Sequence, residues 1–226
     1  VVYRDQYGYS GSKKSSSYRD DEGFLAAGIC PAGQQDVIYE PYRNLATRTV
    51  KGTDFSVYYN FETSLGEFGV TFQSSITDEF EQEPSAEFAR INAAVQSGVL
   101  PAYTTISGYG DLLGVETTGT DQKDTLKVNF KRGDWGATLS ALRLGELLDQ
   151  GVKTSDGLVW KIPTMTTANL SVYKNFTLNG NDARVRFMVK NIADERAPLA
   201  DGFFGFYSDI HRDEGRHFYQ DLRMDF

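Results

Sequence analysis

The sequence is poor in several features that define common classes of protein. Its 226 residues include one cysteine, two histidines and 6 prolines. Because Cys30 is the lone cysteine, it is either a free thiol or has a partner outside this chain. No run of about 18 apolar residues occurs, so a transmembrane helix is excluded. Val1 follows no secretory signal, and we expect the chain to be a fragment.

Positive charge is also scarce. The chain has 23 Lys and Arg against 31 Asp and Glu, a net charge of −8, and no basic stripe. Since nucleic-acid binding depends on basic side chains that displace counterions from phosphates, it is excluded as a function. Phosphate-binding loops, zinc-ligand patterns and nucleophile elbows are missing as well. We therefore expect no enzyme activity, no cofactor and no metal.

What the sequence does contain is alternation of apolar and polar residues. In "TDFSVYYNF", Phe55, Val57 and Tyr59 fall on one side of an extended strand and Asp54 and Ser56 on the other. Strand-favouring β-branched and aromatic residues recur in such segments. The pattern predicts about eight strands, at residues 1–9, 44–62, 67–79, 121–132, 135–147, 161–177, 182–192 and 214–226. A short helix is predicted at 85–98.

The connections between these strands alternate between short and long. The short turns contain Gly, Asn or Asp where a positive φ is needed. Long connections on only one end of the sheet are typical of outer-membrane barrels, whereas a sandwich distributes its loop lengths less regularly. The predicted turns are 63–67, 131–134 and 177–182, and the predicted long loops are about 10–43, 80–120, 148–160 and 193–214.

Aromatic residues recur at the level of the short turns. They are Phe61, Phe68, Phe130, Trp135, Phe176 and the terminal Phe226. Aromatic girdles of this kind flank the apolar band of membrane barrels, although closure beneath ordinary hairpins is an alternative. In the final segment Leu222, Met224 and Phe226 alternate with charged residues. We interpret the apolar row as facing lipid and the charged row as facing an aqueous lumen.

The fold class predicted from these patterns is all-β, an antiparallel transmembrane barrel forming a single domain over residues 1–226. Two alternatives remain open. One is a complete eight-stranded barrel with an adhesion, enzyme or scaffold role, which can close on an interior filled by side chains. The other is a soluble β-sandwich that acts as a binding module. Pairing between residues 1–9 and 214–226 would favour the small barrel.

Four segments resemble TonB-dependent outer-membrane receptors. They are "NLATRTVKGTDFSVYYNF", "IPTMTTANLSVYKNF", "RVRFMVKNIADERAP" and the closing "EGRHFYQDLRMDF". The resemblance covers roughly residues 44–226 and is strongest over 161–226. The terminal phenylalanine also resembles the signal read by the barrel-assembly machinery.

This resemblance implies a particular architecture and activity. Members of the family have a 22-stranded barrel with an N-terminal plug, and this chain is similar to about the last eight strands, with no plug-like segment or TonB box. The implied activity is energised uptake of a scarce solute, a ferric siderophore or an oligosaccharide, across the bacterial outer membrane. The implied partners are the lipid bilayer, the rest of the barrel and its plug, the TonB complex and a small-molecule solute.

The loop segment "GFFGFYSD" offers candidate ligand-binding residues. Exposed rings on a long loop can stack on a sugar, a heme or an aromatic siderophore, and the alternative is packing against neighbouring loops. The candidates are Phe203, Phe204, Phe206 and Tyr207, with Asp201 and Asp209 as partners for hydroxyl groups. Because few cations lie in these loops, the composition favours a neutral or sugar-like ligand over an anionic chelate.

A second set of candidates is charged. Arg184, Arg186, Asp221, Arg223 and Asp225 are predicted to face the lumen near the turns and to help seat a plug, because charge facing lipid is costly. The remaining polar features favour structural explanations. His211 and His217 lack the further ligands that a metal site needs, and the acidic run 77–87 lacks the spacing of a calcium loop.

Overall fold

The computed structural model describes residues 2–4, 35–38, 46–99 and 108–224. Contacts divide the chain into two units, Val1–Leu45 and Ala46–Phe226, and each is considered by itself. In the first unit, β1 (Val2–Arg4) lies within the strand predicted at 1–9. It pairs antiparallel with β2 (Gln35–Ile38), which lies in the range predicted as a long loop. Cys30 lies outside the described residues. The expectation of one barrel domain over the whole chain stays a prediction.

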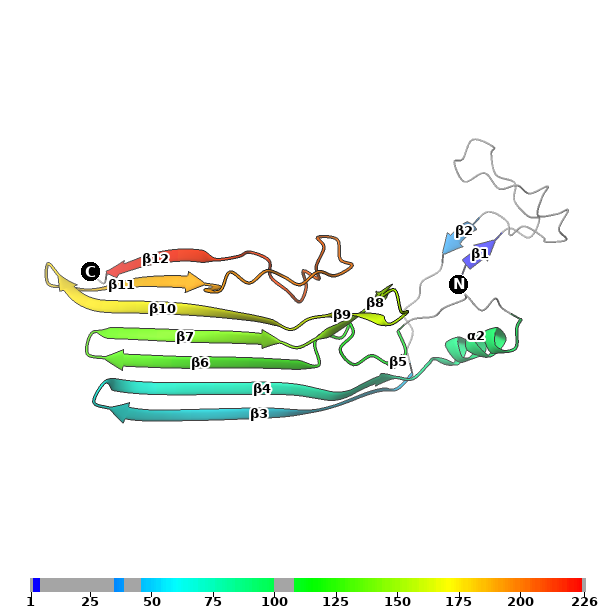
Figure 1. The fold of residues 1–226 in the computed structure, drawn as a ribbon, viewed down its shortest axis with the longest axis horizontal. Coiled ribbons are helices and arrows are strands. Elements are labelled where there is room, and N and C mark those ends of the chain that lie inside the picture. Colours follow the sequence, from blue (N-terminus) through cyan, green and yellow to red (C-terminus); the bar gives the residue numbers. More distant parts are fainter. Residues whose placement is uncertain (1, 5–34, 39–45, 100–107, 225–226) are drawn as a thin grey trace, which may run out of the picture. The chain divides into compact units, whose positions relative to one another are not determined.

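The second unit is built on one antiparallel sheet in which each long strand pairs with the next long strand along the chain (Figure 1). This arrangement confirms the all-β fold class and a long strand within each range predicted from residue 44 onward, although one of these ranges is divided. The strands are β3 (Arg48–Thr63), β4 (Gly66–Gln82), β6 (Gln122–Arg132), β7 (Trp135–Leu144), β10 (Met165–Leu178), β11 (Asn181–Lys190) and β12 (His217–Met224). β5 (Gly110–Asp111) pairs with the end of β4.

The predicted helix is present as α2 (Ala86–Gln96), where Ser85 Oγ accepts a hydrogen bond of 3.3 Å from the Phe88 amide. A serine at this position satisfies one of the amides that a helix leaves free at its start. No helix among the described residues has the length and apolar composition to cross a bilayer.

The range 148–160, predicted as a loop, is instead a hairpin of β8 (Leu147–Lys153) and β9 (Val159–Ile162). Its register shifts between Asp149 and Lys153, which interrupts the alternation that marks the other strands. The predicted strand at 161–177 is also divided, because Pro163 lies between β9 and β10 and proline has no amide to donate.

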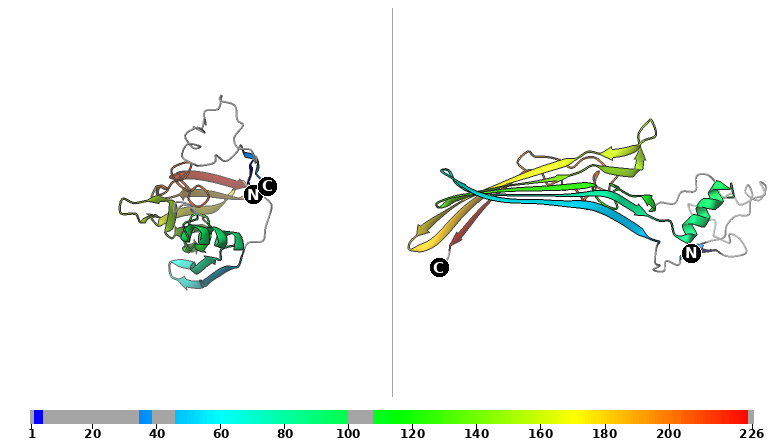
Figure 2. Two further views of the ribbon diagram at one scale, coloured as in Figure 1. Left: turned by 90° about the vertical axis from the view of Figure 1, so that its right-hand side faces the viewer. Right: turned by 90° about the horizontal axis from the view of Figure 1, so that it is seen from below.

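The three predicted short turns are confirmed at one end of the sheet. The β10–β11 turn shows why these residues suit them. Asn179 and Gly180 have φ of 52° and 84°, and two successive positive φ angles define the type I′ turn that follows the twist of a hairpin. The connections at the other end contain α2, the β8–β9 hairpin and the segment 191–216 (Figure 2).

Cross-strand register places the apolar rows of all these strands on one face. A single row across the sheet runs Tyr59, Val70, Val128, Leu139, Leu170, Val189 and Phe218. Neighbouring rows contain the aromatic residues predicted near the turns, and Phe68 lies 5.1 Å from Phe61 and 5.0 Å from Phe130 between ring centroids. Phe226 lies outside the described residues. We call this the apolar face and the opposite one the polar face.

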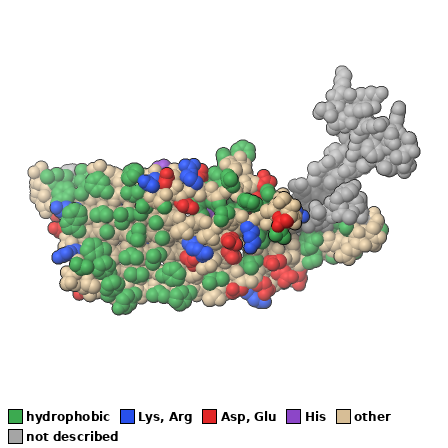
Figure 3. All heavy atoms as spheres, viewed as in Figure 1, with side chains coloured by type: hydrophobic (Ala, Val, Ile, Leu, Met, Phe, Trp, Pro, Cys, Tyr) green, Lys and Arg blue, Asp and Glu red, His purple; other side chains and the backbone are tan. Residues whose placement is uncertain are grey.

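The apolar face is exposed rather than covered. Phe187 is 55% exposed and Phe218 is 73% exposed, although burial of a large apolar side chain normally stabilises a fold by about 1.5–3 kcal/mol. The largest fully buried apolar side chains, Leu147, Ile162 and Val115, lie instead in the connections at the long-loop end. Hydrophobic side chains cover the part of the sheet nearer the turns, and charged ones gather toward the other end (Figure 3).

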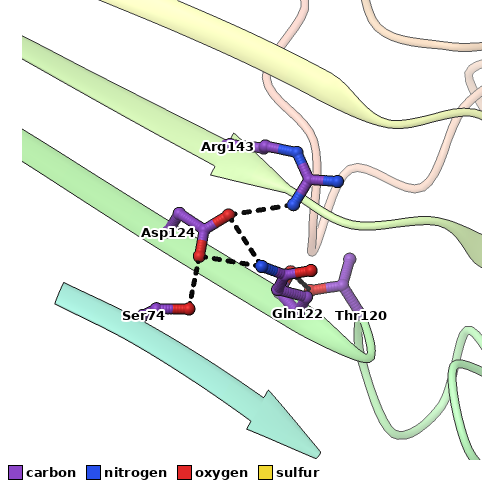
Figure 4. Close-up of polar contacts among 5 residues, drawn as sticks. All are labelled: Ser74, Thr120, Gln122, Asp124 and Arg143. Carbon is purple, nitrogen blue, oxygen red and sulfur yellow. Dashed lines mark hydrogen bonds and ion pairs between the residues drawn. The ribbon is translucent and has the colours of Figure 1, made fainter. Parts of the chain in front are cut away.

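Charged residues limit the apolar face at both ends. On β6 it begins after Asp124, which accepts hydrogen bonds from Ser74 Oγ (2.6 Å) and Arg143 Nη1 (2.9 Å) (Figure 4). It ends at Arg132, eight residues further along the strand. At about 3.4 Å per residue the interval is roughly 27 Å.

Candidate functional site

The candidate ligand residues belong to a cluster where the segment 193–216 meets the β8–β9 hairpin. Asp149 of β8 holds the two together. Its side chain is only 1% exposed, and its Oδ2 accepts a 2.8 Å hydrogen bond from the Asp201 amide while its Oδ1 accepts one of 3.1 Å from the Gly151 amide. A second contact joins the same elements, since Trp160 Nε1 donates to the Leu199 carbonyl at 3.3 Å.

The Tyr207 hydroxyl lies close enough to the Asp149 carboxylate for that group to act on its pKa. Burial raises the pKa of the Tyr207 hydroxyl well above its usual value of 10.0, and the interaction with Asp149 raises it further. The negative charges of Asp149, Glu116 and Asp201 act in the same direction. The hydroxyl is therefore a proton donor at every physiological pH, in surroundings of negative potential.

The aromatic residues that precede Tyr207 are displayed by a tight turn. The Gly205 amide donates to the Gly202 carbonyl and the Ala200 amide donates to the Gly205 carbonyl, both at 2.9 Å. Glycine is required at 202, because a Cβ there would lie 2.3 Å from the Phe206 carbonyl oxygen. The turn brings the aromatic rings into one cluster, with centroids 5.0 Å apart for Phe203 and Phe204 and 6.2 Å apart for Phe204 and Phe206.

Two of these rings are free to contact a ligand. Phe203 is 96% exposed and Phe204 is 65% exposed, so neither packs against the neighbouring loops, whereas Phe206 and Tyr207 are half-buried. Asp201 and Asp209 are exposed in the same segment. The arrangement offers ring faces and edges for stacking beside carboxylates that accept hydrogen bonds from hydroxyl groups. Ligand binding by these residues stays a prediction.

Two polar residues of this region, Asp149 and Glu116, were missed from the sequence, and His211 was considered there only as a metal ligand. The only signal for Asp149 is an acidic residue directly after the apolar pair Leu147 and Leu148, and its partners lie far along the chain. His211 is 1% exposed, and neither ring nitrogen has a hydrogen-bond partner within the described parts of the chain. Burial lowers the pKa of His211 below its ordinary value of 6.5, which favours the neutral ring.

The ends of the segment are fixed by two motifs that were noted in the sequence only as a resemblance. In "KNIADER", the Asn191 side chain donates to the Glu195 carbonyl at 2.8 Å and accepts from the Glu195 amide at 2.9 Å. Asp194 then accepts from the Arg216 amide at 2.7 Å, directly before β12. The motif therefore ends β11 and positions the start of the next strand.

An ion pair closes the same segment. Arg196 donates to both carboxylate oxygens of Asp213, at 2.8 and 2.6 Å, and the Ala197 amide adds a third hydrogen bond. These hydrogen bonds, first that from Arg196, lower the pKa of Asp213 below 3.8. Asp213 is thus ionised at neutral pH and holds the two arms of the segment together.

The second predicted set of residues lies on the polar face near the turns. Register places Arg184 opposite Arg223 and Arg186 opposite Asp221, so all four share the polar face, while Asp225 lies outside the described residues. Arg184 Nε donates to Asn175 at 2.7 Å, and the Nε of Arg186 is buried without a hydrogen-bond partner in the described chain. A role in seating a plug stays a prediction.

These arginines border a polar groove of about 530 Å³. Arg184 and Arg223 line it together with the carboxylates of Asp134 and Asp182. The Arg184 guanidinium also lies 4.5 Å from the centroid of the Tyr173 ring. Such a groove suits a polar partner that presents carboxylates or amides.

Comparisons with protein-family models, with curated proteins and with solved structures return no match. The resemblance to TonB-dependent receptors therefore rests on the quoted motifs alone.

Proposed function

We propose that the chain is part of an outer-membrane β-barrel that takes up a scarce solute with energy from the TonB complex. The observation that carries the proposal is the exposed apolar face, to which every long strand contributes. Leu139, Leu170 and Phe187, from three neighbouring strands, are each more than a third exposed on it. Water would disfavour such a surface, whereas the acyl chains of a bilayer would cover it at no cost.

Two further features support a large barrel over the alternatives. In the unit Ala46–Phe226, β3 and β12 are the edges of the sheet and do not pair with each other. A sandwich would bury its apolar rows against a second sheet, but here those rows are exposed. Edge strands with free backbone groups need further strands to pair with, and a larger barrel would supply them.

The receptor role rests on the motifs and on the loop cluster. The segments around Asn191 and Gly215 resemble the late strands of TonB-dependent receptors, and their side chains form the contacts that end β11 and start β12. In that proposal the short turns face the periplasm and the aromatic turn faces the outside. Arg184, Arg186, Asp221 and Arg223 then face the lumen, where they would contact a plug.

The solute that fits the cluster best is neutral and rich in hydroxyl groups, such as an oligosaccharide. Phe203 and Phe204 offer stacking surface, and the charges that act on Tyr207 are all negative. Negative potential disfavours an anionic ferric chelate. A ferric siderophore is the second candidate, because cationic side chains of a plug would make the potential around the loop cluster positive.

The regulation of the gene tests the choice of solute. Transcript levels of the full receptor are compared in cells starved of iron and in cells supplied with a glycan as carbon source. Induction by the glycan supports the proposal, and deletion of the gene should then slow growth on that glycan alone. Induction by iron starvation overturns the choice of an oligosaccharide. Absence of the protein from purified outer membranes overturns the membrane location itself.

A further inference from the structure

One row at the turn end of the apolar face combines two cations with an indole ring. Arg132 of β6 pairs in register with Trp135 of β7, which pairs with Lys174 of β10. The Lys174 ammonium lies 5.2 Å from the centroid of the Trp135 ring, within range of a cation–π interaction. Trp135 itself is 51% exposed.

None of the residues that the structure describes neutralises the charges of this row. Within the described parts of the chain, the Arg132 guanidinium makes no hydrogen bond or ion pair, and Lys174 contacts only the indole. At the opposite limit of the same face, Arg143 is paired with Asp124 at 2.9 Å. No Asp or Glu occupies the apolar-face positions of the described strands between the row of Phe61 and the turns.

A shallow groove of about 280 Å³ leads from Arg132 and Trp135 onto the apolar face, with Lys174 on the far side of the indole. Phe130, Ala137 and Val172 line it beside Arg132 and Trp135. The site therefore joins a positive, exposed end to an apolar channel. That combination suits an amphiphile with a negative head, and the chain's overall charge of −8 makes this local positive patch distinctive.

We propose that Arg132, Trp135 and Lys174 bind the headgroup phosphate of an anionic glycerophospholipid, with one acyl chain lying in the groove. The inference rests on the proposed membrane location. At the turn end of the apolar face, lipids are then selected by the charge of their headgroups. Arg132 and Lys174 hold the phosphate from two sides, while Trp135 lies at the level where indole rings meet headgroups.

The test uses Trp135 as a local reporter. The chain has two tryptophans, so Trp160→Phe leaves Trp135 as the only one. The full chain with this substitution is reconstituted in vesicles that contain brominated phosphatidylglycerol or brominated phosphatidylcholine, whose acyl chains quench indole fluorescence on contact. Quenching at varied lipid ratios gives the relative affinity of the two lipids at this position. We expect phosphatidylglycerol to bind roughly fivefold more tightly for each cation, at low salt.

Matched variants separate a site from general attraction. Arg132→Gln with Lys174→Gln should reduce the preference to about one. Lys127→Gln with Lys131→Gln changes the net charge equally but lies on the polar face, so the preference should persist. Equal quenching by both lipids in the chain that keeps Arg132 and Lys174 overturns the lipid site. So does an equal loss of preference in the Arg132/Lys174 and the Lys127/Lys131 double variants. Absence of quenching by either lipid counts against the membrane location on which the site depends.

Discussion

At the scale of single residues, Asp149 is the side chain on which the loop cluster depends most. It is buried and accepts hydrogen bonds from the Asp201 and Gly151 amides. Asp149→Ala would leave these donors without a partner, and each buried donor without a partner costs about 1–3 kcal/mol. We expect faster hydrogen exchange over 193–216 than in the unmodified chain. Asp156→Ala, an exposed acid in the same hairpin, should leave that exchange unchanged, and equal effects would contradict the role of Asp149.

His211 makes the same segment sensitive to mild acid. Burial keeps its pKa in the folded state below the ordinary 6.5, so between these two values the unfolded state binds more protons. The neutral, buried His211 ring therefore makes its full contribution to the free energy of unfolding above about pH 6.5. Below that pH the free energy of unfolding falls, by at most about 1.4 kcal/mol per pH unit. Asp213 titrates lower, below 3.8, and does not affect this window.

His211→Leu should remove that dependence, because leucine does not titrate and fills a similar volume. The measurement is hydrogen exchange of 193–216 between pH 7.5 and 5.5 in both proteins. The unmodified chain should exchange faster as the pH falls, after correction for the intrinsic rate, and the variant should not. A parallel response of the two proteins would show that another group titrates.

At the scale of elements, the aromatic turn at 202–206 is the feature to which we assign the proposed ligand recognition. Phe203→Ala and Phe204→Ala each remove an exposed ring, so the fold should keep its stability while affinity for the solute falls. A stacked ring contributes about 0.5–1.5 kcal/mol beyond buried area, which predicts a roughly twofold to twelvefold loss for each ring. The loss is measured as the change in the equilibrium dissociation constant for the inducing solute. Leu158→Ala, which removes an exposed apolar side chain of the β8–β9 turn, is the control, and a similar loss there would argue against stacking.

The elements also show which features the sequence could predict. Alternation of apolar and polar residues in β6 and β10 marks them as strands with one apolar face, so the long strands were predictable, as was the Asn179-Gly180 turn. The β8–β9 hairpin was not, because its register shift removes the alternation. The Asp149–Asp201 contact was not either, since it joins residues 52 positions apart and depends on how two connections pack. Exposure of Phe203 followed only from the tight turn around Gly202.

At the scale of the whole molecule, the two faces of the sheet make opposite demands on their surroundings. Leu170 of β10 lies at the middle of the apolar face between Leu139 and Val189, and its neighbour Ser171 lies on the polar face between Thr138 and Met188. If the apolar face meets lipid, Leu170→Arg places a charge near mid-depth of the bilayer. The expected cost is about 2–4 kcal/mol, while the same change at an aqueous lumen costs little.

We therefore expect Leu170→Arg to destabilise the folded chain in phospholipid vesicles and Ser171→Arg to leave it nearly unchanged. Both substitutions introduce the same side chain one position apart on one strand, so they change the net charge equally and differ mainly in the face on which the arginine lies. Urea titration of vesicle-reconstituted full chain, followed by tryptophan fluorescence, measures the difference. If the apolar face meets water instead, an exposed Leu→Arg change should alter stability by only about 0.5 kcal/mol in either direction. Equal midpoints for both variants would then exclude lipid as the solvent of that face.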